Sequence, residues 1–331
     1  MLALQRRAGN RAVAAYLRVS PARRLQRAEQ TLAVAGGQSV RYDDARVGSG
    51  EVSRVWESLV GMGARLDPAA AASIYAATRR EDAERPTPGI PRPPVNVKSL
   101  DIVKPVLEWR YTELAGLEQA LQLARSIPAL AARDPAAVVF GKVASLISFK
   151  LRMTDPGGGA KKFVERHADS AGDMEQAETV TPAAGPMSIV LAAGCKDVWP
   201  PTTTEGTLMD VVDDSINDRA RALHEFDVRM LRMTWIHELG HTLYPAYKAE
   251  WERLVTEAVK RKEGSPTGYA ARKPSVEEDF CESFTVLALY PKFSHVLGPT
   301  RTGFFARHRE LVQRDQTSGA APANAVSAAK I

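Results

Sequence analysis

The spacing of apolar residues divides the chain into segments with a helical period and segments with the period of a strand. Apolar positions three and four residues apart predict amphipathic helices over residues 52–66, 68–79, 101–130, 216–243 and 247–262. Apolar and polar residues alternate from Ile147 to Thr154, which predicts a half-buried strand, and residues 187–191 form a second, more apolar strand candidate. This mixture predicts an α+β fold class.

Five prolines between Pro86 and Pro94 interrupt this pattern. Each proline lacks a backbone N–H and restricts the residue before it, so the stretch is incompatible with a helix or a central strand. We therefore expect a linker there. The predicted organisation is a basic arm at 1–30, a helical accessory region with the linker at 31–97, a main domain at 98–314 and a flexible tail at 315–331.

The composition limits the classes of protein to which the chain can belong. Its 331 residues are 44% hydrophobic, which is enough for one large domain or two smaller ones. No apolar run reaches the roughly 18 residues of a membrane span. A net charge of +5 is modest for this length and says little about nucleic acid, and we expect no nucleic-acid partner. Cys195 and Cys281 are too few for a disulfide framework and fit a reducing compartment, although one bridge between them is compatible with the sequence.

A helical stretch at residues 234–243 contains the strongest chemical signal in the chain, a His-Glu-x-x-His motif made by His237, Glu238 and His241. Residues four apart on a helix share a face, with Cβ atoms about 5–6 Å apart, so the two imidazoles can bind one zinc ion. Glu238 adjoins the first histidine, from where it can reach a metal-bound water and act as general base. The alternative is a chance spacing of two histidines, which is unusual in a chain with six histidines.

A catalytic zinc ion needs a third protein ligand and an open position for water. The metzincin class would place glycine at position 244 and histidine at position 247. Tyr244 and Tyr247 occupy these positions, which excludes that class. The third ligand is therefore expected elsewhere in the chain.

The helix predicted after Pro274 offers the best candidates for the third ligand. Glu278 and Glu282 lie four residues apart and so share a face. One carboxylate could bind the metal while the other holds a ligand histidine by its free N–H. We favour Glu278 as the ligand, with Glu277 or Glu282 as alternatives. A capping box from Ser275 to Glu278 would explain one glutamate without a metal, but not the second.

The two motifs together, His-Glu-Leu-Gly-His and Glu-Asp-Phe-Cys-Glu-Ser-Phe, resemble the gluzincin metallopeptidases of the anthrax lethal factor type over residues 233–289. The resemblance implies a zincin-like domain with a small mixed sheet, an active-site helix and a second glutamate-bearing helix. It also implies Glu278 as the third ligand, Glu282 as a support for the ligands, and Tyr269 as a group that stabilises the oxyanion. Cys281 replaces the usual alanine, and we interpret it as a small buried residue and not as a ligand.

The N-terminal arm carries a second resemblance. Between Gln5 and Arg27 it has seven arginines and no acidic residue, where a signal peptide would need an apolar region. Residues 4–13, Leu-Gln-Arg-Arg-Ala-Gly-Asn-Arg-Ala-Val, resemble the leader of proteins encoded with bacterial extracellular contractile injection systems. This resemblance implies a toxin payload that is made in the bacterial cytoplasm, packaged and delivered to a target cell, with the particle lumen or a loading chaperone as its partner. The alternative is a basic amphipathic helix with no special role.

These inferences predict a zinc endopeptidase that hydrolyses peptide bonds in a protein or peptide substrate. In this hypothesis His237, His241 and Glu278 hold Zn²⁺, and a water molecule is the fourth ligand. The alternative is a non-catalytic structural or binding component of the injection particle, in which zinc serves stability. Glu238 favours the enzyme, because a purely structural site does not require it.

Overall fold

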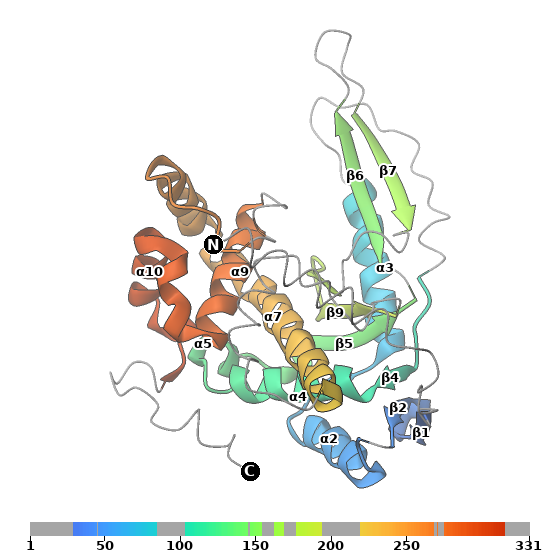
Figure 1. The fold of residues 1–331 in the computed structure, drawn as a ribbon. Helices are drawn as coiled ribbons and strands as arrows, with labels where there is room; N and C mark the ends of the chain where they lie inside the picture. The colour runs from blue at the N-terminus through green and yellow to red at the C-terminus, as the bar shows by residue number, and fades with distance from the viewer. Residues whose placement is uncertain are drawn as a thin grey trace, which may run out of the picture.

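A computed structural model describes residues 29–44, 46–84, 103–144, 146–153, 162–168, 177–193, 219–267, 270 and 275–314. This part of the chain combines helices with small mixed sheets and is α+β, as the sequence predicts (Figure 1). Residues 1–28 of the basic arm, the proline-rich linker and the C-terminal tail lie outside the described residues. Cys195 and Tyr269 lie outside them as well. The predictions made for these segments and residues therefore stay predictions.

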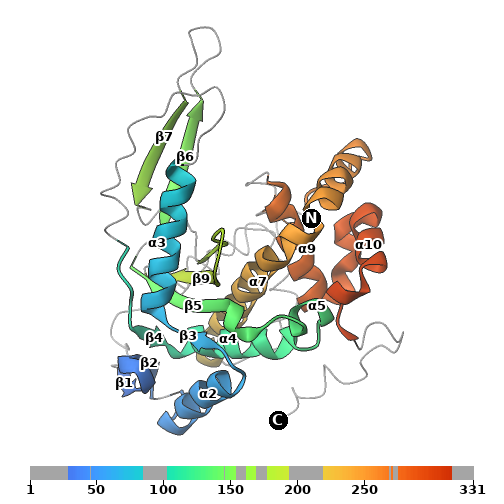
Figure 2. The same cartoon turned by 180° about the vertical axis from the view of Figure 1, so that it is seen from behind.

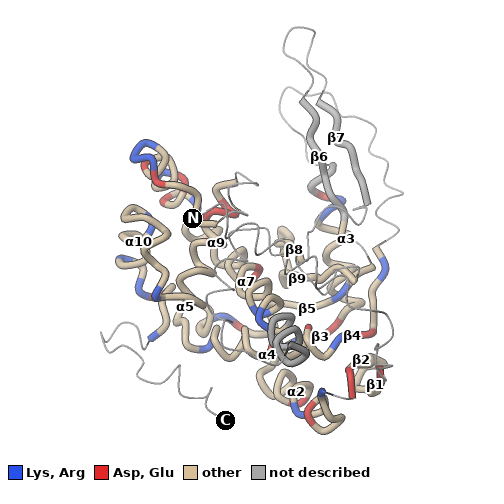
Figure 3. The backbone as a smooth tube through the Cα atoms, viewed as in Figure 1, with Lys and Arg blue, Asp and Glu red and all other residues tan. Residues whose placement is uncertain are grey.

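A four-stranded sheet in the order β3–β5–β9–β8 lies beside the long helix α7 (Arg219–Lys260) (Figure 1; β8 is labelled in Figure 3). Its strands are β3 (Arg65–Leu66), β5 (Val138–Val143), β8 (Ala177–Val180) and β9 (Met187–Ala192). β3, β5 and β9 run parallel, whereas β8 is antiparallel to β9 and forms one edge of the described sheet. β9 confirms the strand predicted at 187–191. The edge strand β8 contacts α7, which carries the His-Glu-x-x-His motif.

The strand predicted from the alternation after Ile147 is also present. It is β6 (Ile147–Met153), which pairs antiparallel with β7 (Lys162–Ala168). Figure 1 shows this ribbon projecting away from the four-stranded sheet.

The predicted accessory region contains strands as well as helices. The helices α2 (Ser49–Gly61) and α3 (Pro68–Glu84) overlap the two predicted ranges, but α2 ends at Gly61, and Arg65–Leu66 at the end of its predicted range form β3 instead. In addition, β1 (Glu29–Ala33) pairs with β2 (Ser39–Asp43), and β2 pairs in parallel with β4 (Glu108–Arg110) from beyond the linker. The region is therefore not purely helical. Most residues of β1 and β2 are exposed or half-buried, so their sequences lack the alternation that would predict strands.

Helix α3 lies very close to the sheet at one glycine. A Cβ atom on Gly141 of β5 would be 2.3 Å from the Cβ of Ala71 and 3.2 Å from the Cα of Pro68. Close by, the hydroxyl of Ser188 in β9 donates a hydrogen bond to the carbonyl of Ala71 at 3.0 Å. Only glycine leaves room for this approach of helix and strand.

The helix predicted over residues 101–130 is shorter than expected. α4 (Tyr111–Ala124) begins with a capping box in which the Glu113 carboxylate accepts the backbone N–H of Arg110 at 2.7 Å. This interaction fixes the start of the helix, and the three residues before it form β4 instead. A short helix, α5 (Pro128–Ala131), follows α4.

α7 runs through the middle of the molecule as one helix (Figures 1 and 2). The predicted break between helices at 216–243 and 247–262 is wrong, because Pro245 lies inside the continuous helix. A proline normally disrupts a helix interior by removing a hydrogen bond. Here Trp235 and Trp251, on either side of Pro245, are both fully buried, so packing holds the helix together across the proline.

The second glutamate-bearing helix begins where the sequence predicts it. α9 (Val276–Leu289) starts after the N-cap residue Ser275, whose hydroxyl oxygen accepts the backbone N–H of Glu278. A 3₁₀ segment, Pro291–Leu297, leads from it to α10 (Gly298–Arg307). Figure 2 shows α9 between α7 and α10.

One large cluster of buried apolar residues joins both sides of the linker. Val40, Val55 and Leu59 from before the linker belong to the same cluster as Trp235 and Phe280 from α7 and α9. Described residues on both sides of the proline-rich segment therefore share one core. None of the described helices is long and apolar enough to cross a membrane.

Candidate metal centre

Helix α7 places the two histidines of the motif on one face, directed toward α9. The Nε2 atoms of His237 and His241 are 3.2 Å apart. His237 is buried and His241 is half-buried, so neither imidazole is an ordinary surface histidine. The spacing of four residues thus brings the two rings together as predicted.

Glu278 of α9 approaches both of these nitrogen atoms. Its Oε2 lies 3.1 Å from Nε2 of His237 and 3.9 Å from Nε2 of His241. Ligand atoms about 2.0–2.1 Å from a tetrahedral zinc ion are about 3.3 Å apart. The separations of 3.2 and 3.1 Å match this value, whereas the 3.9 Å between Glu278 and His241 is longer, so the three atoms come close to the arrangement around a single tetrahedral ion.

The other nitrogen atom of each imidazole is paired with its own carboxylate. Nδ1 of His237 is 2.7 Å from Oε1 of Glu282, and Nδ1 of His241 is 2.8 Å from Oε1 of Glu277. A carboxylate that accepts the Nδ1–H leaves the Nε2 lone pair free for a metal and fixes the orientation of the ring. Glu282 lies where the sequence predicts a supporting residue. The partner of His241 was missed, because the sequence offered Glu277 only as a substitute ligand.

The approach of α7 and α9 depends on Gly240. A Cβ atom at this position would lie 3.3 Å from the Cα of Cys281 and 3.3 Å from Cδ1 of Phe284. Larger side chains would separate the helices that carry the histidines and the glutamates.

A buried ion pair anchors the start of α9 from its other side. Arg301 of α10 donates two hydrogen bonds to the carboxylate of Asp279, at 2.8 and 2.7 Å. Arg301 also donates to the carbonyl of Leu297, and both charged side chains are buried. Such bidentate pairs restrict geometry strongly, so Asp279 and its neighbour Glu278 have a fixed position.

Cys281 also lies within reach of the histidines. A ligand atom from each of His237, His241 and Cys281 lies within 4.8 Å of the others, so this largely buried group could hold a metal ion. Burial, followed by the nearby carboxylates, raises the pKa of the Cys281 thiol well above its ordinary value. The sequence interpretation treats Cys281 as a filler residue, whereas the structure adds it to the candidate ligands.

Four carboxylates surround the two imidazoles and make the site strongly attractive to a cation. Burial by itself would lower the pKa of His237, but its hydrogen bonds with Glu278 and Glu282 outweigh this effect and raise the pKa well above its ordinary value. The charge of Glu238 acts in the same direction. The environment therefore favours positive charge at the point where the Nε2 atoms meet. Two imidazoles and a carboxylate form a donor set that suits zinc.

Glu238 is buried next to the histidines and is held by the edge strand β8. The hydroxyl of Thr179 donates a hydrogen bond to Oε2 of Glu238 at 2.6 Å and lies 3.0 Å from the backbone carbonyl oxygen of the same residue. Sequence reasoning missed Thr179, because a single threonine in an unpredicted strand gives no signal. It also missed Thr267, whose hydroxyl donates to Oε2 of Glu282.

No protein-family model matches this chain, and no significant match was found among curated proteins or solved structures. The chemistry of the site is therefore argued from its own geometry. The oxyanion role expected of Tyr269 stays a prediction, because that residue lies outside the described part of the chain.

Proposed function

We propose that the chain is a zinc-dependent endopeptidase with a zincin-like fold, in which His237, His241 and Glu278 hold Zn²⁺. The observation that carries this proposal is the convergence of two imidazole nitrogens and one carboxylate oxygen. Each of the two imidazoles is also held in place by a separate carboxylate. The position of Glu238 supports a catalytic role, because it lies beside the ligands but is not one of the carboxylates paired with the Nδ1 atoms of the histidines.

Bound zinc would supply a Lewis acid that polarises a peptide carbonyl and lowers the pKa of a coordinated water. The protein's own contribution is proton transfer. Thr179 donates a hydrogen bond to Oε2 of Glu238, and in this proposal the other carboxylate oxygen, Oε1, is the one that accepts a proton from water at the zinc site. Glu238 accepts the proton there and then delivers it to the nitrogen of the leaving amine.

An extended peptide is a suitable substrate because of the edge strand. β8 pairs with β9 on one side only within the described residues, so its other edge retains backbone donors and acceptors. A peptide can add to such an edge as a further strand. Because Thr179 of β8 holds Glu238, a peptide on this edge would lie beside the proposed general base.

The rival hypothesis is a non-catalytic zinc site that serves stability. Cys281 gives this alternative its specific support, since a thiolate together with the two histidines and Glu278 would close the coordination sphere. A closed site leaves no position for water. The two hypotheses therefore differ in whether Glu238 has a chemical role.

The substitution Glu238→Gln separates them. We expect the variant to keep one zinc ion per chain and to lose peptide cleavage by about 10²–10⁴-fold, because only the proton acceptor is removed. Zinc is measured by metal analysis and cleavage with a diverse peptide library. Glu252→Gln, on an exposed part of α7, is the matched control and should retain both properties. Wild-type zinc protein that cleaves no peptide, or equal cleavage by Glu238→Gln, would contradict the proposal.

Cobalt substitution tests Cys281 directly. A thiolate ligand gives a strong near-ultraviolet charge-transfer absorption with Co²⁺, whereas imidazole and carboxylate ligands do not. We expect no such band in the cobalt-loaded wild type. A band that disappears in Cys281→Ala would favour the closed, structural site.

We also propose that the basic arm delivers the chain as a payload of a contractile injection particle, with the particle lumen or a loading chaperone as partner. The support for this is the leader-like sequence at residues 4–13. A segment rich in arginine can be attracted to an acidic surface by its charge.

A further inference from the structure

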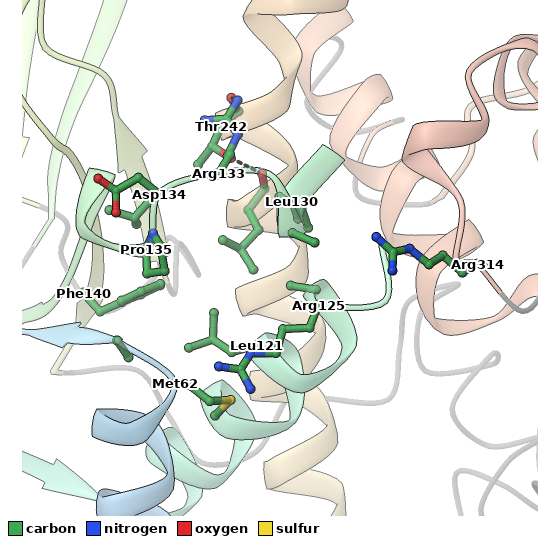
Figure 4. A pocket seen from close by; sticks show the side chains of 15 residues that line it. Met62, Leu121, Arg125, Leu130, Arg133, Asp134, Pro135, Phe140, Thr242 and Arg314 are labelled. Carbon is green, nitrogen blue, oxygen red and sulfur yellow. Dashed lines mark hydrogen bonds between the residues drawn. The ribbon is translucent and has the colours of Figure 1, made fainter. Parts of the chain in front are cut away.

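A separate cavity lies on the other side of α7, between that helix, α4, α5 and β5 (Figure 4). Its volume is about 400 Å³, within the range of about 300–1,000 Å³ that small-molecule sites occupy. Its wall is mostly apolar and includes Met62, Leu121, Leu130, Val138, Phe140 and Leu239. None of the proposed zinc ligands lines it.

Arginines outnumber carboxylates among the described residues that line this cavity. Arg125, Arg133 and Arg314 line it, and Asp134 is the one carboxylate among its described lining residues. Asp134 already has a structural role, since its Oδ1 accepts the backbone N–H of Ala136 at 2.9 Å and caps a 3₁₀ turn. The cavity therefore combines apolar walls with an excess of positive charge.

Arg133 is the least exposed of the three arginines that line the cavity. It is half-buried, and its Nη2 donates a hydrogen bond to the backbone carbonyl of Thr242, as Figure 4 shows. No carboxylate within the described part of the chain forms an ion pair with it, and burial lowers the pKa of its guanidinium. A guanidinium has five N–H donors, so donors remain after the bond to Thr242.

We propose that this cavity binds a small amphipathic monocarboxylate, with the carboxylate on Arg133 and the apolar body against Leu121, Leu130 and Phe140. Arginine recognises carboxylates through paired, charge-assisted hydrogen bonds, and a bound carboxylate would give Arg133 an anionic partner. The apolar body of the ligand covers the apolar surface of the cavity wall and so removes that surface from water, which favours binding. Both parts of the ligand are needed, and the proposal does not depend on zinc or on peptidase activity.

Calorimetric titration of the full-length, zinc-loaded chain tests this site with three probes. Octanoate has both parts of the ligand, 1-octanol lacks the charge and acetate lacks the apolar body. We expect octanoate to bind about 10–100-fold more tightly than 1-octanol, because hydrogen bonds to a charged group are lost in the alcohol. Acetate should bind more weakly than octanoate for lack of apolar burial.

Two variants locate the binding site. Arg133→Gln keeps a donor for the carbonyl of Thr242 but removes the charge, so octanoate should bind no better than 1-octanol. Ala131→Trp places a large ring at an exposed position of the cavity rim and should abolish binding of both probes. Arg253→Gln, exposed on α7 and remote from the cavity lining, is the charge-matched control and should change neither affinity.

Three results would overturn the proposal. One is the absence of octanoate binding to the wild type at millimolar concentration. Another is equal affinity of the wild type for octanoate and 1-octanol. The third is unchanged octanoate binding in Ala131→Trp, which serves as a test of location even where Arg133→Gln fails to fold.

Discussion

Each histidine of the motif has a carboxylate partner of its own, and the two partners differ in exposure. The side chain of Glu282 is 12% exposed and is also bound by Thr267, whereas that of Glu277 is 45% exposed. Water can replace an exposed partner more easily than a buried one. His237 therefore depends on its partner more strongly than His241 does.

We predict that Glu282→Ala weakens zinc affinity by about 10–100-fold without abolishing binding, because it removes the group that orients His237. Glu277→Ala should have a smaller effect, since solvent reaches that pair. A competition titration with a chromophoric chelator measures both affinities. Complete loss of zinc from Glu282→Ala, with normal binding by Glu278→Ala, would mean that the roles of these two glutamates are reversed.

Thr179 offers a test of how Glu238 is positioned. We predict that Thr179→Val lowers kcat by about 10-fold or more while zinc content stays at one per chain, because the hydrogen bond that holds Oε2 of Glu238 is lost. Thr179→Ser retains the hydroxyl and should restore most of the activity. Steady-state kinetics and metal analysis on both variants check this. Equal kcat in Thr179→Val and wild type would show that the hydrogen bond does not matter for proton transfer.

The sequence predicts site residues that lie on the same helix at a fixed spacing. It does not predict contacts between residues of different elements. His237 and His241 follow from a spacing of four residues, and Glu278 with Glu282 from a second such spacing. Thr179 reaches Glu238 from a strand 59 residues earlier, and no local pattern contains that contact. Which carboxylate faces which histidine depends on the rotation of α9 against α7, and packing decides it.

At the scale of elements, two glycines set how closely layers approach. Gly240 brings α7 and α9 together at the candidate metal centre, and Gly141 brings α3 against β5. β5 supports β9, which in turn pairs with the edge strand that carries Thr179. The distance between helix and sheet at Gly141 therefore bears on the position of the edge strand.

We predict that Gly141→Ala destabilises the protein by about 1–3 kcal/mol, because the added methyl group meets Ala71 with no room to move. Gly61→Ala at the end of α2 is the control, since nothing lies within 4 Å of its added Cβ, and it should change stability by about 0.5 kcal/mol or less. Urea unfolding of both variants gives the free energies. Equal stabilities would show that α3 can shift without cost.

The elements that the sequence predicts correctly are well buried. α2, α3 and α9 each bury one face, β9 is buried on both faces, and each overlaps its predicted range. α7 is misjudged at Pro245, because local propensity indicates a break that tertiary packing overrides. The short strands β1 and β2 are not predicted, because few of their residues are buried and their sequences therefore show no alternation of apolar and polar positions.

At the scale of the whole molecule, the candidate metal centre and the basic arm occupy different parts of the chain. The ligands and Glu238 lie on α7 and α9, while residues 1–28 precede the first described strand. Zinc binding and catalysis should therefore not require the arm. The arm can therefore be deleted without removing any proposed zinc ligand or Glu238.

We predict that deletion of residues 1–28 leaves zinc content and peptide cleavage near wild type but reduces loading into assembled injection particles. The physical reason is loss of a basic segment that steers docking to an acidic surface, and raised salt should weaken loading of the full chain in the same way. Co-purification of both chains with particles measures loading. Equal loading would refute the packaging role, and lost cleavage would show that the arm belongs to the folded enzyme.

The pairing of β2 with β4 and the single core across the linker also affect how the chain folds as it is synthesised. When the ribosome has made α2, the apolar side chains of Val55 and Leu59 still lack the partners that α4 provides, and α4 in turn packs on α7. Contacts between residues so far apart in sequence form late and slowly. The nascent chain therefore carries exposed apolar surface until more than two thirds of it has been translated.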